Sequence, residues 1–206
     1  MAWDLIRHPD SGDPDPDPAL AALPRLVGGL DAVAFWLLGA RSQVTRATVA
    51  EVLAKAPPSA LRVVDVGLRQ NFYDAATVDW ALRQVHVAKL NADELAAATA
   101  LLGLGPTPES LAGAYDLDTL IVTRGAAGAT SLRAGRSTEV AAAPVPHFVD
   151  AVGCGDAFLA GYLHARLSGH GEEDCLRAGA RRGAYAAGLR GGLPPHPDGQ
   201  PPQQQA

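Results

Sequence analysis

A carboxylate and two glycines lie close together near residue 155, and their spacing suits phosphate chemistry. Gly153 and Gly155 let backbone amides converge without obstruction from a Cβ atom. The apolar pattern from Phe158 to Leu167 then continues as a helix, whose positive N-terminal end favours an anion such as a phosphate. Asp156 lies beside that anion site, where a carboxylate could take a proton from an attacking hydroxyl group. The alternative is a glycine-rich turn capped by Asp156, without a catalytic role.

The nine residues 150–158, DAVGCGDAF, resemble the C-terminal signature of the ribokinase-like (PfkB) carbohydrate kinases, usually written Asp-Thr-x-Gly-Ala-Gly-Asp-x-Phe. Ala151 stands where the family has Thr, and Cys154 stands where it has Ala. The resemblance implies that Asp156 is the catalytic base. It also implies an anion hole formed by the backbone amides of Gly153, Cys154 and Gly155.

The first aspartate of this signature is Asp150. The resemblance implies that a monovalent cation, K⁺, binds beside it. The alternative role of Asp150 is to orient the turn by accepting hydrogen bonds from nearby amides, which needs no cation.

A second motif, VVDVGLRQNFY at residues 63–73, resembles the Asp-x-Asn-x-Arg strand end of sugar kinases in this family, with Gly67 where Asn is usual. The resemblance places Asp65 and Arg69 on the substrate or phosphate side. Arg69 is a cation that could pair with phosphate or with Asp65, and it could equally be a surface cation.

A third motif, at residues 87–95, contains Asn91 and Glu94, which reproduce the family's Asn-x-x-Glu. At a strand-to-helix junction these side chains share a helix face and could hold waters around Mg²⁺ near the ATP phosphates. The same spacing fits a capping box, with Asn91 as N-cap and Glu94 at N3, and both roles can hold at once.

A fourth motif follows a buried strand at residues 120–129 and resembles the family's Thr-x-Gly-x-x-Gly. It assigns nucleotide binding to Thr123, Gly125 and Gly128, because two glycines let a phosphate and ribose lie close to the backbone. Alone, this motif would indicate only a hairpin turn. The last helix and its exit, residues 184–192, would complete the nucleotide site.

Composition indicates a cytoplasmic enzyme core. The 206 residues are 48% hydrophobic and 19% charged, with a net charge of −5. Basic residues are dispersed, so neither nucleic acid nor an anionic membrane is expected as a partner. The longest apolar run, residues 32–38, is too short to cross a bilayer. Cys154 and Cys175 lack the spacing of a metal site or a disulfide framework, and Cys154 is expected to be unreactive.

Short β-rich runs alternate with helical stretches, which predicts an α/β fold with a mostly parallel central sheet and helices on both faces. Strands are expected near residues 32–37, 62–66, 86–89 and 119–123, and a meander at 129–132 and 138–142. Helices are expected near residues 46–55, 75–83, 92–102, 108–114, 156–167 and 172–189. The repeated Asp-Pro at 10–18 predicts an exposed loop.

The resemblance covers residues 1–193, interpreted as the C-terminal part of a ribokinase-like kinase domain, with residues 194–206 as a disordered tail. The sugar-binding Gly-Gly motif and the β-sheet lid of the family's N-terminal part are not visible. We therefore expect an N-terminally truncated, fructokinase-like sugar kinase without its lid, using ATP and Mg²⁺ on a small-molecule sugar. Exposed apolar sheet edges would favour a homo-oligomer.

Two other functions remain open. The chain could be a non-catalytic nucleotide-binding remnant of the same fold, which Gly67 and Ala151 favour. A dinucleotide-dependent oxidoreductase is suggested only by the Gly-x-Gly turn, and Phe158 occupies the position of the third glycine that such a site needs.

Overall fold

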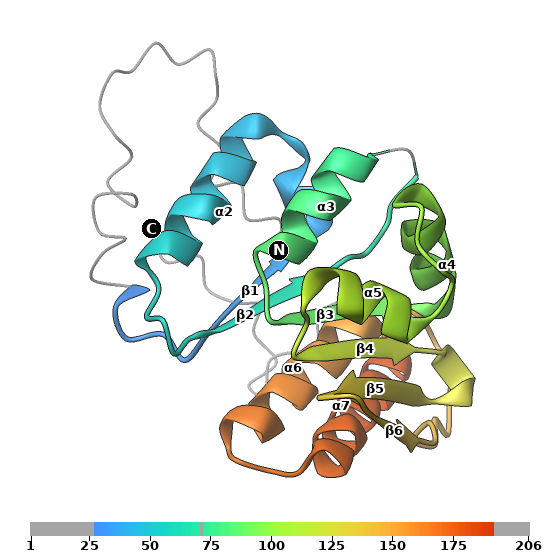
Figure 1. Cartoon of the computed structure of the whole chain (residues 1–206). Coiled ribbons are helices and arrows are strands. Elements are labelled where there is room, and N and C mark those ends of the chain that lie inside the picture. Colours follow the sequence, from blue (N-terminus) through green and yellow to red (C-terminus); the bar gives the residue numbers. More distant parts are fainter. Residues whose placement is uncertain (1–26, 71, 192–206) are drawn as a thin grey trace. The chain divides into compact units, whose positions relative to one another are not determined.

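The computed structural model of this chain describes residues 27–70 and 72–191 (Figure 1). These residues form two compact units. The first holds residues up to 122 together with 132–135, and the second holds 123–131 together with the residues from 136 onward. The predicted loop at 10–18 and the predicted tail at 194–206 lie outside the described residues.

The sheet of the first unit runs in chain order through β1 (Ala32–Trp36), β2 (Leu61–Asp65), β3 (Val87–Asn91) and β4 (Thr119–Thr123). Strands β1 and β2 are parallel, as are β2 and β3. The central strands are buried on both faces, as expected for a parallel sheet covered by helices. All four predicted strands are confirmed; the last has the predicted bounds, and those of the other three differ by one or two residues.

Helices connect these strands. They are the 3₁₀ helix η1 (Leu37–Arg41), which the sequence pattern had not indicated, and α2 (Gln43–Lys55), α3 (Ala75–Arg83), α4 (Ala92–Leu101) and α5 (Pro108–Tyr115). Each α-helix begins after an N-cap whose side chain accepts a hydrogen bond from the N3 amide. These N-caps are Ser42, Asp74, Asn91 and Thr107.

One hydrophobic core joins the helices of this unit to its sheet. Its buried members come from every strand and from α2 to α5, and include Phe35, Leu53, Val64, Val78, Leu82, Leu90, Leu95, Leu111 and Leu120. Among the buried residues that the structure describes, only Asp65 and Lys89 carry a charge. Asp65 is the last residue of β2, and Lys89 is the middle residue of β3.

The second unit contains the 3₁₀ helix η2 (Gly125–Ala127), most of β5 (Ala129–Arg133), β6 (Arg136–Val140), α6 (Cys154–Leu167) and α7 (Glu172–Ala187). A two-residue turn at Ala134 and Gly135 joins β5 to β6, and both residues have positive φ, of 47° and 74°. This pair of left-handed residues is what a type I′ hairpin turn requires. The predicted meander and both predicted helices are confirmed.

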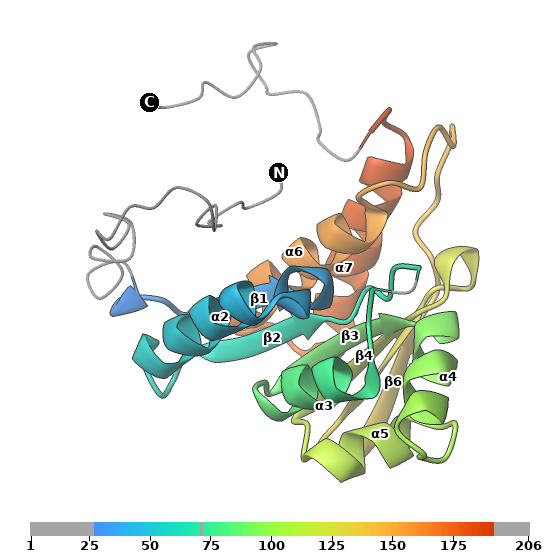
Figure 2. The same cartoon turned by 90° about the horizontal axis from the view of Figure 1, so that it is seen from above.

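Glycines let α6 and α7 pack closely, and Figure 2 shows the two helices side by side. A Cβ atom on Gly161 would lie 2.7 Å from the carbonyl oxygen of Ala178, and one on Gly179 would lie 2.9 Å from that of Phe158. A Cβ on Gly183 would lie 3.2 Å from the carbonyl oxygen of Cys154, at the first turn of α6. The contact between the helices therefore reaches the start of α6, where the signature lies.

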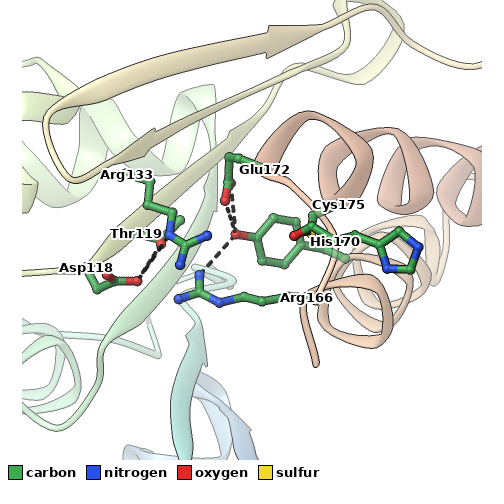
Figure 3. A network of polar contacts seen from close by, with 8 residues as sticks. Asp118, Thr119, Arg133, Arg166, His170, Glu172 and Cys175 are labelled. Carbon is green, nitrogen blue, oxygen red and sulfur yellow. Dashed lines mark hydrogen bonds and ion pairs between the residues drawn. The ribbon is translucent and has the colours of Figure 1, made fainter. Parts of the chain in front are cut away.

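A buried tyrosine ties the same two helices together (Figure 3). The Tyr162 hydroxyl donates to the Glu172 carboxylate at 2.9 Å and accepts from Nη1 of Arg166 at 3.2 Å. Burial, reinforced by Glu172, raises the pKa of Tyr162 above its ordinary range. Separately, within the first unit, Asp118 accepts from the Thr119 hydroxyl and pairs with Arg133.

Within the described part of the chain, none of the helices combines the length and apolarity needed to cross a membrane.

Candidate active site

The signature turn leads directly into α6. Gly153 is the N-cap of this helix and has φ 79° and ψ −5°, in the left-handed region that favours glycine. Because the N-cap is a glycine, no side chain caps the first turn. The amide of Cys154 donates to the Ala151 carbonyl at 3.3 Å, which closes the turn, whereas Gly155 follows within the first helical turn. The N-cap residue therefore places no side chain at the positive end of the helix dipole.

Asp156 lies on the first turn of α6 and is exposed. It is the acidic residue of that turn and follows directly the three residues whose amides the sequence assigned to an anion hole.

Asp150 holds the signature turn in place by accepting two backbone hydrogen bonds. Its Oδ1 accepts from the Val152 amide at 3.0 Å, and its Oδ2 accepts from the Gly191 amide at 3.3 Å. These backbone hydrogen bonds, that of Val152 first, hold the pKa of Asp150 below its ordinary value. The orienting role proposed for Asp150 from the sequence is thus present in the structure.

Cys154 presents an unreactive thiol. Burial and the nearby Asp150 carboxylate raise its pKa, and its Sγ lies 3.7 Å from the Asp150 carbonyl oxygen. A thiol with a raised pKa carries little thiolate at neutral pH, so a helix N-terminus has not activated this one.

The second glycine pair follows β4. Thr123 ends the strand, Gly125 opens η2 with φ 54°, and Gly128 closes it with φ 91°. A Cβ on Gly128 would lie only 2.1 Å from the Val140 carbonyl oxygen, so no other residue fits there without movement of the backbone. The Arg124 amide donates to the Gly128 carbonyl at 2.8 Å. Gly128 therefore has a packing role, whatever it contacts in a bound nucleotide.

A cavity of about 490 Å³ opens in the second unit between the chain before the signature and α7. Residues 143–147 form one wall, and Ala184, Tyr185, Gly188 and Leu189 form the other, together with Arg181. This cavity is wide open to solvent, unlike the enclosed clefts that bury most of a small ligand. Of the residues 184–192 that the sequence assigned to a nucleotide site, Ala184, Tyr185, Gly188 and Leu189 line this cavity; residue 192 lies outside the described chain.

In the first unit, Asp65, the last residue of β2, forms an ion pair with Lys89 in the middle of β3. The Lys89 Nζ donates to Asp65 Oδ2 at 2.6 Å, and the two residues are 5% and 4% exposed. From the sequence, Arg69 could pair with phosphate or with Asp65, or be a surface cation. Arg69 is exposed, and its charge acts on Glu94.

Gly67 has φ 39°, and its nearest neighbours to a Cβ are atoms of Asp65 at 3.8 Å and 3.9 Å. Among residues with a side chain, Asn tolerates this left-handed conformation best. Glycine at this position therefore keeps the backbone shape that Asn would adopt and removes only its amide.

Asn91 and Glu94 form a capping box at the start of α4. Asn91 Oδ1 accepts from the Glu94 amide, and Glu94 Oε2 accepts from the Asn91 amide, each at 2.8 Å. The pKa of Glu94 is raised, first by burial and then by the charge of Asp65. The Asn91 amide and the charges of Lys89 and Arg69 lower it and offset part of this rise.

This donor set fits a water-mediated Mg²⁺ site and does not fit a directly bound ion. One carboxylate oxygen of Glu94 is used by the cap, which leaves Oε1 for a water ligand. Over the residues described, no cluster of three or more His, Cys, Asp or Glu side chains could hold a metal ion.

Each unit thus gathers its own part of the predicted residues. The second unit contains the signature and, in a separate loop, the glycines after β4. The first unit contains Asp65 and Glu94, and the charge of Asp65 acts on Glu94. Lys89 was missed, although a lysine inside the apolar run of residues 87–90 is a signal that could have identified it. The cavity beside α7 could not be located from the sequence.

Solved structures of two kinases share this fold. A fructokinase from Vibrio cholerae O395, solved with fructose, ADP and calcium ion bound, superposes with a TM-score of 0.69 at 21% identity, covering 80% of this chain and 57% of that one. The nucleoside kinase of Methanocaldococcus jannaschii, an archaeal member of the ribokinase family, gives a TM-score of 0.66 at 21% identity, covering 79% and 51%. These likenesses show a ribokinase-like α/β fold.

The family follows from the sequence match. Residues 30–198 match the pfkB family carbohydrate kinase, and the chain belongs to that family. It is 32% identical over 174 residues to a 2-dehydro-3-deoxygalactonokinase of Haloferax volcanii, covering 79% of this chain and 54% of that protein. It is 39% identical over 113 residues to an acarbose 7(IV)-phosphotransferase of Actinoplanes sp., covering 52% and 38%. The chain therefore spans about half, or less, of the length of these relatives.

Proposed function

We propose that this chain carries the phosphoryl-transfer half of a sugar kinase and transfers the γ-phosphoryl group of ATP to a sugar hydroxyl. The observation that carries the proposal is the start of α6, where a left-handed Gly153 leaves the helix without a side-chain cap and Asp156 is exposed on the first turn. Membership of the pfkB family supports the same reaction.

In the proposed step, the Asp156 carboxylate accepts the proton of the acceptor hydroxyl as that oxygen forms a bond to the γ-phosphorus. The bond between the γ-phosphorus and its bridging oxygen breaks, and ADP leaves. The amides of Gly153, Cys154 and Gly155 would stabilise negative charge on the transferred group, with help from the helix dipole. The Cys154 amide must then exchange its 3.3 Å bond with Ala151 for the phosphoryl oxygen.

For the nucleotide, we propose that the base enters the cavity beside Tyr185 and Ala184, which is lined mainly by apolar side chains. Thr123, Gly125 and Gly128 would lie along the ribose and phosphates. Asn91 and Glu94 would hold water ligands of Mg²⁺. When bound, this ion would neutralise negative charge on the phosphate oxygens. Asp150 would place the backbone that borders a K⁺ ion.

The acceptor is proposed to be a sugar of ketose type. The relatives support this class through their names, which include fructokinases from Salmonella that are 38% identical over 96 residues. The 2-dehydro-3-deoxygalactonokinase adds a keto-sugar acid to the compounds worth testing.

The second candidate is a nucleotide-binding protein without turnover, favoured by Gly67, which lacks the amide of the usual Asn, and by Ala151, which lacks the usual hydroxyl. Two measurements on the full chain separate the candidates. ADP release with ATP, Mg²⁺ and a panel of fructose, 2-keto-3-deoxy sugar acids and acarbose tests turnover. Calorimetric titration with ADP tests binding. Sugar-dependent ADP release supports the kinase, binding alone supports the second candidate, and the absence of both contradicts the two together.

A further inference from the structure

Lys89 has no role in the proposed reaction, yet it is one of two charged residues among the buried side chains that the structure describes. It is paired in register with Asp65 across the parallel strands β2 and β3; Asp65 is the last residue of β2, and Lys89 lies two residues before the end of β3. In open parallel α/β sheets, ligands bind outside the carboxyl ends of the strands, the end of the sheet that Asp65 reaches.

The position of this pair is not explained by stability. Its neighbours along the two strands, Val64, Val66, Ala88 and Leu90, are fully or almost fully buried and apolar. An apolar pair of similar volume would commonly be as stable as a buried ion pair, or more so, because it needs no desolvation of charge. A buried ion pair at the ligand-binding end of the sheet therefore indicates that the site needs a charge there, or needs a side chain held in one orientation.

Two features show what the pair orients. The backbone turns at Gly67 immediately after Asp65, and the Asp65 Oδ1 atom lies 3.9 Å from the place of a Cβ on that glycine. Lys89 lies two residues before Asn91, which ends β3, is the N-cap of α4 and donates its amide to the Glu94 carboxylate. The pair thus lies between the end of β2 and the capping box that follows β3.

We propose that Lys89 is a positioning residue: it holds the Asp65 carboxylate at the edge of the sheet and so fixes the electrostatic surroundings in which Glu94 meets a hydrated divalent cation. This proposal rests on the proposed function, because it takes Glu94 to be the outer ligand of that cation.

The test uses Mn²⁺ alone as a probe and needs no turnover. In the wild-type chain, Mn²⁺ should broaden the backbone amide signals of residues 91–95 at lower concentration than those of Glu172, Glu173 and Asp174. Those three carboxylates open α7 and report unspecific binding. Loss of an outer-shell partner weakens metal sites by about 10- to 100-fold.

The discriminating variant is Asp65→Leu/Lys89→Met, which replaces the pair by apolar side chains. We expect it to melt close to the wild type and to need at least about tenfold more Mn²⁺ for the same broadening at residues 91–95. A double variant that responds to Mn²⁺ as the wild type does would overturn the proposal, since the pair would then be structural only.

Lys89→Arg and Lys89→Gln provide a second comparison that does not depend on the double variant. Retained Mn²⁺ response in Lys89→Arg with loss in Lys89→Gln supports the proposal, and equal responses in the two overturn it. A wild-type chain without preferential broadening at residues 91–95 also overturns it. Failure of the proposed function is detected separately, by the absence of sugar-dependent ADP release.

Discussion

The close contact of α6 and α7 at their glycines predicts that a Gly→Ala substitution destabilises the protein at one position and stabilises it at another. Gly161 is buried within α6, and a Cβ there would lie 2.7 Å from the Ala178 carbonyl oxygen. Gly113 lies within α5, and a Cβ there would meet nothing within 4 Å. The two substitutions gain the same helix propensity, about 1 kcal/mol.

Only Gly161→Ala adds a clash with backbone, and overpacking of this kind costs about 1–3 kcal/mol. The net effect of Gly161→Ala is therefore a loss of up to about 2 kcal/mol, and that of Gly113→Ala is a gain of up to about 1 kcal/mol. For a chain of this size, each kcal/mol changes Tm by about 2–4 °C.

Thermal unfolding followed by circular dichroism measures both variants, and amide hydrogen exchange shows whether the loss in Gly161→Ala is concentrated in α6 and α7. A Gly161→Ala chain that gains stability as Gly113→Ala does would refute the reasoning, because the two helices would then not be in contact at the distance observed.

Three further predictions concern single side chains. Gly67→Asn should fold with stability close to wild type, because Asn tolerates the φ of 39° and no atom lies nearer than 3.8 Å, whereas Gly67→Val should be destabilised; equal Tm values for the two would contradict this. Tyr115 donates to Asp79, and burial raises its pKa to about 12, so its contribution to stability is complete below the unfolded pKa near 10 and is lost as the pH rises to about 12. The free energy of unfolding, measured with urea from pH 9 to 12, should therefore fall more steeply in wild type than in Tyr115→Phe. Parallel curves of this free energy against pH would count against the prediction. Cys154 should react slowly with a disulfide reagent at pH 7 in the folded chain and rapidly after unfolding, since burial raises its pKa; rapid labelling of the folded chain would show an activated thiol instead.

Local patterns were sufficient to predict the regular elements of this fold. Short apolar runs, such as residues 119–123, act within a few residues, so strands and helices could be predicted to within a few positions. The 3₁₀ helix at residues 37–41 could not be separated from the strand before it, because its apolar residues continue the same run.

The candidate site was predictable where chemistry is encoded in a short motif. Gly153 and Asp156 are three residues apart, so one helix start fixes both. The pairing of Lys89 with Asp65 could not be predicted, because register between β2 and β3 decides which cation reaches that carboxylate, and register is set by tertiary packing. For Arg69 the sequence left three roles open, and its exposure agrees with the role of a surface cation.

The central claim is that Asp156 acts as the base of a phosphoryl transfer, and it is tested most directly by the rate of sugar-dependent ADP release in Asp156→Asn. Asp93→Asn is the matched control, because Asp93 is also an exposed aspartate on the first turn of a helix. We predict a loss of about 10²- to 10⁴-fold in Asp156→Asn and a rate near wild type in Asp93→Asn. Sugar-dependent ADP release that is unchanged in Asp156→Asn would contradict the account.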